Sequence, residues 1–133
     1  MPTLDEALLL FQQAPNMLIN IEVKAPNENL ALLEKYDYKE ACAIVKEHLV
    51  RHKVQHRTII SSFCPLVTKQ MQQIDRDRNI QILQLLNYDG KERNGYQTAP
   101  GQSGINVDLH YLDQSVIQAT QTAGNSIAVW YWN

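Results

Sequence analysis

Residues 18–24 read Leu-Ile-Asn-Ile-Glu-Val-Lys. Successive side chains of a β-strand point to opposite faces, so Asn20, Glu22 and Lys24 share one face of the predicted strand. Strands of a helix-covered parallel sheet are usually apolar on both faces, yet here a carboxylate and an ammonium group lie roughly 6.6 Å apart on one face. A strand-end site for a cation and an anionic substrate would explain this pattern; a structural ion pair between the two side chains is the alternative.

The segments around this strand alternate between helical and extended patterns. Thr3 and Glu6 form a Ser/Thr-x-x-Glu capping box, which predicts a helix of about three turns at the N-terminus. Helical spacing of apolar residues predicts further helices, and short runs of β-branched and apolar residues predict further strands. The predicted helices cover residues 41–49, 65–74 and 116–123, and the predicted strands cover residues 58–63, 80–86, 105–109 and 127–132.

Five strands separated mostly by helices predict parallel pairing, in either a doubly wound sheet or a (β/α)8 barrel. Polar residues near strand ends favour the barrel, because barrel active sites lie at the C-terminal ends of the strands. A complete barrel takes about 250 residues and eight strands, whereas this chain has 133 residues. We therefore predict an α/β fold in one domain, residues 1–133, consisting of a partial (β/α)8 barrel with about five parallel strands. A long irregular loop is expected at residues 87–104, which hold four of the five glycines.

Composition excludes several classes of protein. The formal charge is −2, and the 12 basic residues are scattered among 14 acidic ones, without the basic stripe of a nucleic-acid binder. No apolar run approaches the roughly 20 residues that a membrane-spanning helix needs, and no signal-peptide pattern begins the chain. Cys42 and Cys64 lack Cys-x-x-Cys spacing and are predicted to be buried free thiols. The sequence thus favours a soluble protein of a reducing compartment, with the compartment itself undetermined.

Three of the four histidines, His48, His52 and His56, recur at intervals of four residues. This spacing could place them on one helical face as ligands of a soft metal. Residues 53–55 are expected to end the helix before His56, however. The sequence therefore favours a solvated surface for all three.

Several blocks, in the same order and with similar spacing, resemble the middle and late parts of glycerophosphodiester phosphodiesterases. The first is Pro-Thr-Leu-Asp-Glu, and the second is the strand Ile-Asn-Ile-Glu-Val-Lys. A Ser-Ser-Phe strand and an Ala-Gly pair leading into Val-Trp-Tyr-Trp-Asn follow. These blocks occupy residues 2–6, 19–24, 60–63, 123–124 and 129–133.

This resemblance implies a metal-dependent enzyme that hydrolyses glycerophosphodiesters to glycerol 3-phosphate and an alcohol. It implies that Glu22 is a ligand of a divalent cation, usually Mg or Ca, and that Lys24 lies near the phosphate. Ser62, Phe63 and Trp130 match positions that line the pocket, and we expect them to bind substrate rather than to catalyse. A hard cation prefers carboxylate oxygens and neutralises the charge that grows on phosphoryl oxygens, so these roles are chemically consistent.

The family's N-terminal catalytic blocks do not occur in these 133 residues. They are a His-Arg-Gly strand, a Glu-x-Asp strand with two further metal ligands, and a His-Asp pair. Without a general acid or base, the chain alone is not expected to catalyse the reaction, and no catalytic residue is assigned to it. Three hypotheses follow. The chain is part of a phosphodiesterase completed by a missing segment or by other protein chains, a non-catalytic descendant serving as a structural or interaction subunit, or an unrelated small α/β binding domain.

Overall fold

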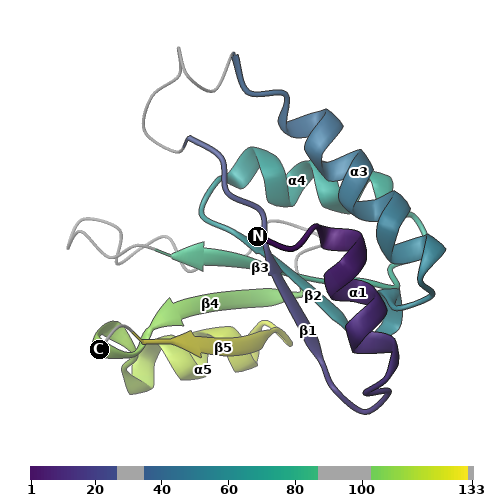
Figure 1. Cartoon of the computed structure of the whole chain (residues 1–133). Helices are drawn as coiled ribbons and strands as arrows, with labels where there is room; N and C mark the ends of the chain where they lie inside the picture. Colours follow the sequence, from purple (N-terminus) through teal and green to yellow (C-terminus); the bar gives the residue numbers. More distant parts are fainter. Residues whose placement is uncertain (27–34, 87–102, 132–133) are drawn as a thin grey trace.

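The computed structural model describes residues 1–26, 35–86 and 103–131. Five parallel strands are hydrogen-bonded to one another in the order in which they occur along the chain (Figure 1). This sequential order is that of a barrel, whereas a doubly wound sheet reverses its strand order at a switch point. The predicted partial (β/α)8 barrel is therefore confirmed. The strands are β1 (Ile19–Glu22), β2 (Thr58–Ser62), β3 (Gln81–Leu86), β4 (Gly104–Asp108) and β5 (Ser126–Trp130).

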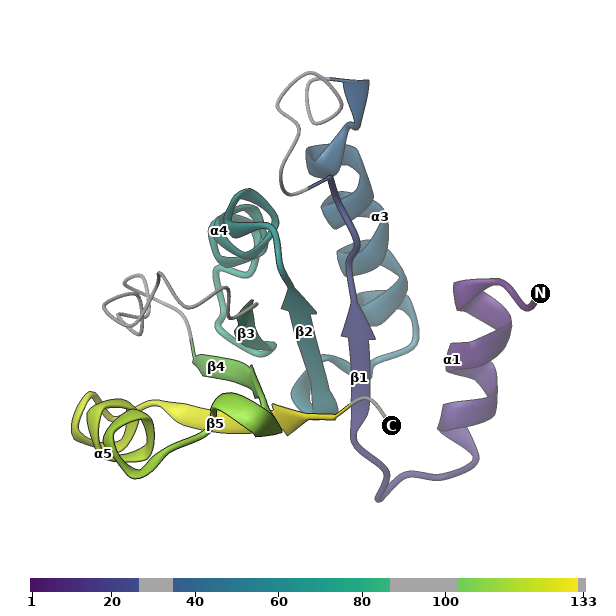
Figure 2. The same cartoon turned by 90° about the vertical axis from the view of Figure 1, so that its left-hand side faces the viewer.

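The helices pack on the outer face of this half-barrel (Figures 1 and 2). The helix α1 covers Leu4–Gln12, α3 Tyr38–Arg51, α4 Pro65–Ile74 and α5 Gln114–Thr122. The main core lies between the helices and the strands, because alternate strand residues point outward into it. It includes Leu8, Cys42, Leu49, Val67 and Met71 from the helices and Ile19, Ile60 and Ile82 from the strands.

The strands and helices observed match the predicted ones to within a few residues. The predicted capping box of Thr3 and Glu6 is formed in both directions. Two 3-10 turns, Gln55–Arg57 and Leu109–Tyr111, were not predicted. The second shortens β4 because the Asp108 side chain accepts a hydrogen bond from the backbone N–H of His110 and so begins the turn.

Most of the predicted loop, residues 87–102, lies outside the described residues. Gly104, which we assigned to that loop, instead begins β4. A Cβ atom on Gly104 would lie 1.9 Å from the carbonyl oxygen of Ser126 in β5. Only glycine therefore allows the two strands to approach this closely.

Arg57 joins the end of α1 to the start of β2. Its side chain is buried, and its guanidinium donates hydrogen bonds to the carbonyl oxygens of Phe11, Ala14 and Met17 at 2.7–3.0 Å. Phe11 lies in the last turn of α1, and Ala14 and Met17 lie between α1 and β1, so one side chain fixes the course of the α1–β1 connection.

Both cysteines are buried free thiols, as predicted. Burial raises the pKa of Cys42 to about 11, so this side chain is neutral near pH 7 and behaves as a small hydrophobic group. No helix in the described part of the chain is both long and apolar enough to span a bilayer.

Candidate functional site

A cavity of about 240 Å³ lies on the inner face of the half-barrel, towards the C-terminal ends of its strands. Strand register explains its lining, because Glu22 pairs with Ser61, Leu85 with Asn106, and Asp108 with Trp130. The cavity thus collects side chains from every strand of the described sheet. They are Asn20, Glu22, Lys24, Ser61, Phe63, Leu85, Asn106, Trp130 and Tyr131.

Glu22 and Lys24 form an ion pair at the mouth of this cavity, with 2.8 Å between Lys24 Nζ and Glu22 Oε1. The Lys24 side chain is 79% exposed and that of Glu22 is 32% exposed. An exposed pair of this kind contributes only about 0–1 kcal/mol to stability. Fold stability therefore does not require the pair, and either side chain could exchange its partner for a ligand at little cost.

Two aromatic rings form one wall of the cavity. The rings of Phe63 and Trp130 meet edge to face, with centroids 6.0 Å apart and planes at 87°. This arrangement is favourable for aromatic pairs and holds both rings in place. The cavity therefore combines a charged mouth with a rigid apolar wall.

The cavity also contains two buried polar atoms that have no hydrogen-bond partner among the described residues. They are Asn106 Oδ1 and Trp130 Nε1. A buried acceptor or donor without a partner costs roughly 1–3 kcal/mol. The two atoms could bond to polar groups of a bound molecule or of another part of the protein.

Four of the five predicted site residues line this cavity: Glu22, Lys24, Phe63 and Trp130. Ser62 does not. It is fully buried on the helix side of β2, where its hydroxyl donates to the Val23 carbonyl at 2.6 Å and accepts from the Cys64 N–H. Its neighbour Ser61 faces the cavity instead, because the β1–β2 register places Ser61 beside Glu22.

Sequence reasoning did not select Asn106, Leu85 or Tyr131. Asn106 carried a usable signal, since it is a polar side chain between Ile105 and Val107 in a buried strand, the same pattern that drew attention to Glu22. Leu85 and Tyr131 carried none, because an apolar or aromatic residue in a strand is ordinarily explained by packing.

The polar groups of the lining suit a hard cation only in part. Glu22 is the one carboxylate among the described lining residues, and the amides and hydroxyl add neutral oxygens. Mg and Ca bind six or more oxygens, usually including more than one carboxylate. Glu22 could therefore be one ligand of such an ion, with the others supplied from outside the described lining.

His110 lies near the cavity without lining it. Its Nδ1 is 2.8 Å from Asp108 Oδ1, its ring centroid is 5.4 Å from that of Tyr131, and its side chain is 60% exposed. The backbone N–H of His110 is the largest cause that lowers the pKa of Asp108, and its ring adds to the effect. The pair has the geometry of a turn held together by its own side chains.

Comparison with known proteins places these observations in a family. The model of the glycerophosphoryl diester phosphodiesterase family matches residues 1–133. No curated protein matches the chain. Among solved structures, a glycerophosphodiester phosphodiesterase from Parabacteroides distasonis is 16% identical with a TM-score of 0.67, and the match covers 99% of this chain and 52% of that one.

Two further structures agree. A protein from Silicibacter pomeroyi, provisionally named a glycerophosphoryl diester phosphodiesterase, is 15% identical with a TM-score of 0.77 over 97% of this chain and 45% of its own. One from Galdieria sulphuraria, provisionally named a glycerophosphodiester phosphodiesterase, is 19% identical with a TM-score of 0.75 over 98% of this chain and 50% of its own. The chain spans about half the length of these structures. From the family match over all 133 residues, the chain belongs to the glycerophosphoryl diester phosphodiesterase family.

Proposed function

We propose that this chain provides one half of the active site of an enzyme that hydrolyses glycerophosphodiesters to glycerol 3-phosphate and an alcohol. The observation that carries the proposal is the gathering of Glu22, Lys24, Phe63 and Trp130 around one cavity towards the C-terminal ends of the strands. That end of a (β/α)8 barrel is where the active sites of such enzymes lie.

Glu22 is the residue of this chain that would hold a divalent cation, Mg or Ca. Such an ion, when bound, neutralises charge that develops on the phosphoryl oxygens during displacement. The carboxylate of Glu22 lies at the cavity and is one-third exposed, so it can reach an ion there after releasing Lys24.

Lys24 is suited to bind the phosphate of the substrate. Its ammonium group lies at the same mouth and is largely exposed, so little desolvation accompanies a change of partner from Glu22 to a phosphate oxygen. Phe63 and Trp130 offer an apolar surface for the glycerol carbons or the head group, and the unpaired Trp130 N–H offers a donor to one of its oxygens.

The lining within the described residues contains no histidine and a single carboxylate. We therefore propose that the general acid and base, and the remaining metal ligands, come from a segment or partner chain that completes the barrel. The same observation is what favours the second candidate, a non-catalytic family member that serves as a structural or interaction subunit.

The test is release of glycerol 3-phosphate from glycerophosphocholine by the protein isolated from its own source, with Mg or Ca added. We expect turnover, and we expect Glu22→Gln to reduce kcat by about 100-fold or more, since an electrostatic group acting on the transition state is removed. Lys24→Met should mainly raise KM. The matched control is Glu47→Gln, an exposed carboxylate on α3 outside the cavity.

The outcomes separate the two candidates. No turnover with either metal, in protein that retains its associated chains, would support the structural subunit. Turnover that is insensitive to Glu22→Gln would contradict the role of Glu22. Residues 1–133 alone should show no turnover, and activity of that isolated chain would contradict the need for outside histidines.

A further inference from the structure

Two of the three histidines at four-residue spacing are not part of a solvated surface. His52 is buried, with only 6% of its side chain exposed, and the His48 side chain is 21% exposed. The surface prediction is therefore wrong for these two, because α1 packs against this face of α3. His56 lies beyond the helix, in the 3-10 turn, and is exposed as predicted.

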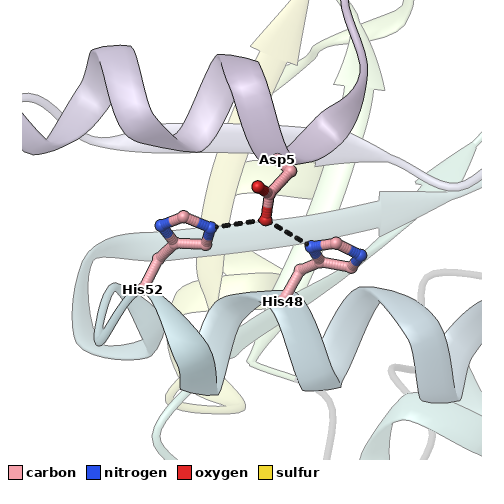
Figure 3. A group of neighbouring side chains, drawn as sticks. All are labelled: Asp5, His48 and His52. Atoms are coloured by element: carbon pink, nitrogen blue, oxygen red, sulfur yellow. Dashed lines mark hydrogen bonds and ion pairs between the residues drawn. The ribbon is translucent and has the colours of Figure 1, made fainter.

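Asp5 of α1 lies between these two histidines (Figure 3). Its Oδ1 is 3.1 Å from Nδ1 of His48 and 2.8 Å from Nε2 of His52. All three potential ligand atoms lie within 4.8 Å of one another. Ligand atoms bonded to one tetrahedral zinc ion at about 2.0–2.1 Å are roughly 3.3 Å apart, so only small movements would convert this cluster into three zinc ligands.

From this geometry, we propose that Asp5, His48 and His52 form a zinc-binding site that clamps α1 to α3. Two imidazole nitrogens and one carboxylate oxygen suit Zn²⁺, and a water molecule would complete a tetrahedral shell. The spacing of the two histidines by one helical turn places both rings on the same side of α3. The proposed function of the cavity neither requires this site nor shares a residue with it.

The charges around the cluster are compatible with a cation. The hydrogen bond from His52 is the largest cause that lowers the pKa of Asp5, so its carboxylate is ionised near neutral pH. Arg51 is the nearest competing cation, with its Nη1 3.6 Å from Asp5 Oδ1. Its guanidinium is also bound by Glu47 at 2.6 Å and is about half exposed, so it can remain with Glu47 when zinc binds Asp5.

Gln12 lies at the ring nitrogen of His52 that would not bind zinc, and could hold that ring in position. Its amide nitrogen lies 3.1 Å from Nδ1 of His52 and 3.3 Å from the His52 carbonyl oxygen. A histidine that binds metal through Nε2 carries its proton on Nδ1 and usually donates it to a fixed acceptor. A half-turn of the Gln12 amide would present its oxygen to that proton.

The first measurement is calorimetric titration of the chelator-treated full protein with ZnCl₂, alongside its melting temperature with and without zinc. We expect one zinc ion per chain at this cluster and a rise in melting temperature. His48→Gln, His52→Gln and Asp5→Asn should each abolish the rise. His56→Gln is the matched control and should retain it, as should Glu22→Gln, which affects only the proposed catalytic cation.

Two further measurements cover variants that fail to fold. Gln12→Ala changes an exposed residue on α1 and should weaken zinc binding by about 10–100-fold without removing a ligand. Co²⁺ in place of zinc should give the visible absorption of tetrahedral cobalt without a thiolate charge-transfer band, which excludes Cys42 and Cys64 as ligands. Equal zinc binding by wild type and His52→Gln, or no binding by wild type, would overturn the proposal and leave a hydrogen-bonded cluster only.

Discussion

Gln84 and Asn106 carry the same chemical group on neighbouring strands, yet their surroundings differ completely. The Gln84 amide faces the helices, donates to the carbonyls of Ser62, Phe63 and Leu85, and accepts from Thr68. Asn106 lines the inner cavity, where its buried Oδ1 has no partner among the described residues. The Gln84 amide thus has partners for both its nitrogen and its oxygen on the helix side of the sheet, whereas Asn106 Oδ1 and Trp130 Nε1 at the cavity have none among the described residues, as is expected where a surface binds something else.

The largest change in unfolding free energy should come from removing a buried polar group that has its hydrogen-bond partners and lies outside the cavity. Asp75 is almost fully buried, accepts from the Ile80 N–H and pairs with Lys46. Asp75→Ala should cost roughly 3 kcal/mol in unfolding free energy, at the low end for a broken buried pair because Lys46 can still reach water. Urea denaturation measures this cost. Glu47→Ala, which breaks an exposed pair with Arg51 on α3, the helix that carries Lys46, is the control and should cost no more than about 0.5 kcal/mol.

The next experiment tests the two amides directly. Gln84→Leu should lower the unfolding free energy by about 2 kcal/mol, since it leaves buried carbonyls without donors. Asn106→Leu should instead raise it by about 1 kcal/mol, because it removes an unsatisfied acceptor at nearly constant volume. Thermal denaturation of the two variants side by side gives the sign of each change. Equal destabilisation by both would show that Asn106 is satisfied as well as Gln84.

A smaller difference in stability is expected between alanine variants of the two consecutive serines of β2. Ser62→Ala should cost about 1 kcal/mol, because the Val23 carbonyl and the Cys64 N–H lose their partner. Ser61→Ala removes only a 3.3 Å contact with Asn20 and should change stability by less than about 0.5 kcal/mol. Chemical denaturation of both variants measures this difference in stability. A substrate-binding assay should give the opposite ranking, with Ser61→Ala losing more affinity than Ser62→Ala.

The smallest expected effect concerns pH. The pKa of Asp108 lies below its ordinary value of 3.8, chiefly through the His110 N–H. A carboxyl group with a lowered pKa in the folded state stabilises the protein above its unfolded pKa, and this contribution disappears as pH falls through the folded value. Asp108→Asn should therefore be less stable than wild type at about pH 6, and the difference should shrink towards about pH 3. A constant difference over this range would assign the effect to packing instead.

The sequence was sufficient to predict the elements and the face on which Glu22 and Lys24 lie, because period-2 alternation and helical spacing are local properties. It could not distinguish Ser61 from Ser62. Either serine could face the cavity until the register of β2 against β1 is known, and register depends on the pairing of distant segments.

The cluster of Asp5, His48 and His52 that we propose as a zinc site could not be predicted from the sequence, for a similar reason. His48 and His52 could be placed on one face of a helix from their spacing, but Asp5 is more than 40 residues away and reaches them only through the packing of α1 on α3. Burial of that helix face was therefore a property of the tertiary structure alone.

Arg57 has a consequence for the order in which the chain can assemble during synthesis. The carbonyls of Phe11, Ala14 and Met17 each accept a hydrogen bond from a side chain translated about 40 residues later. The corner between α1 and β1 therefore stays incomplete on the ribosome until residue 57 has left the exit tunnel. The N-terminal helix can form early and can contact α3, but its connection to β1 is fixed by Arg57 only just before the second strand is made.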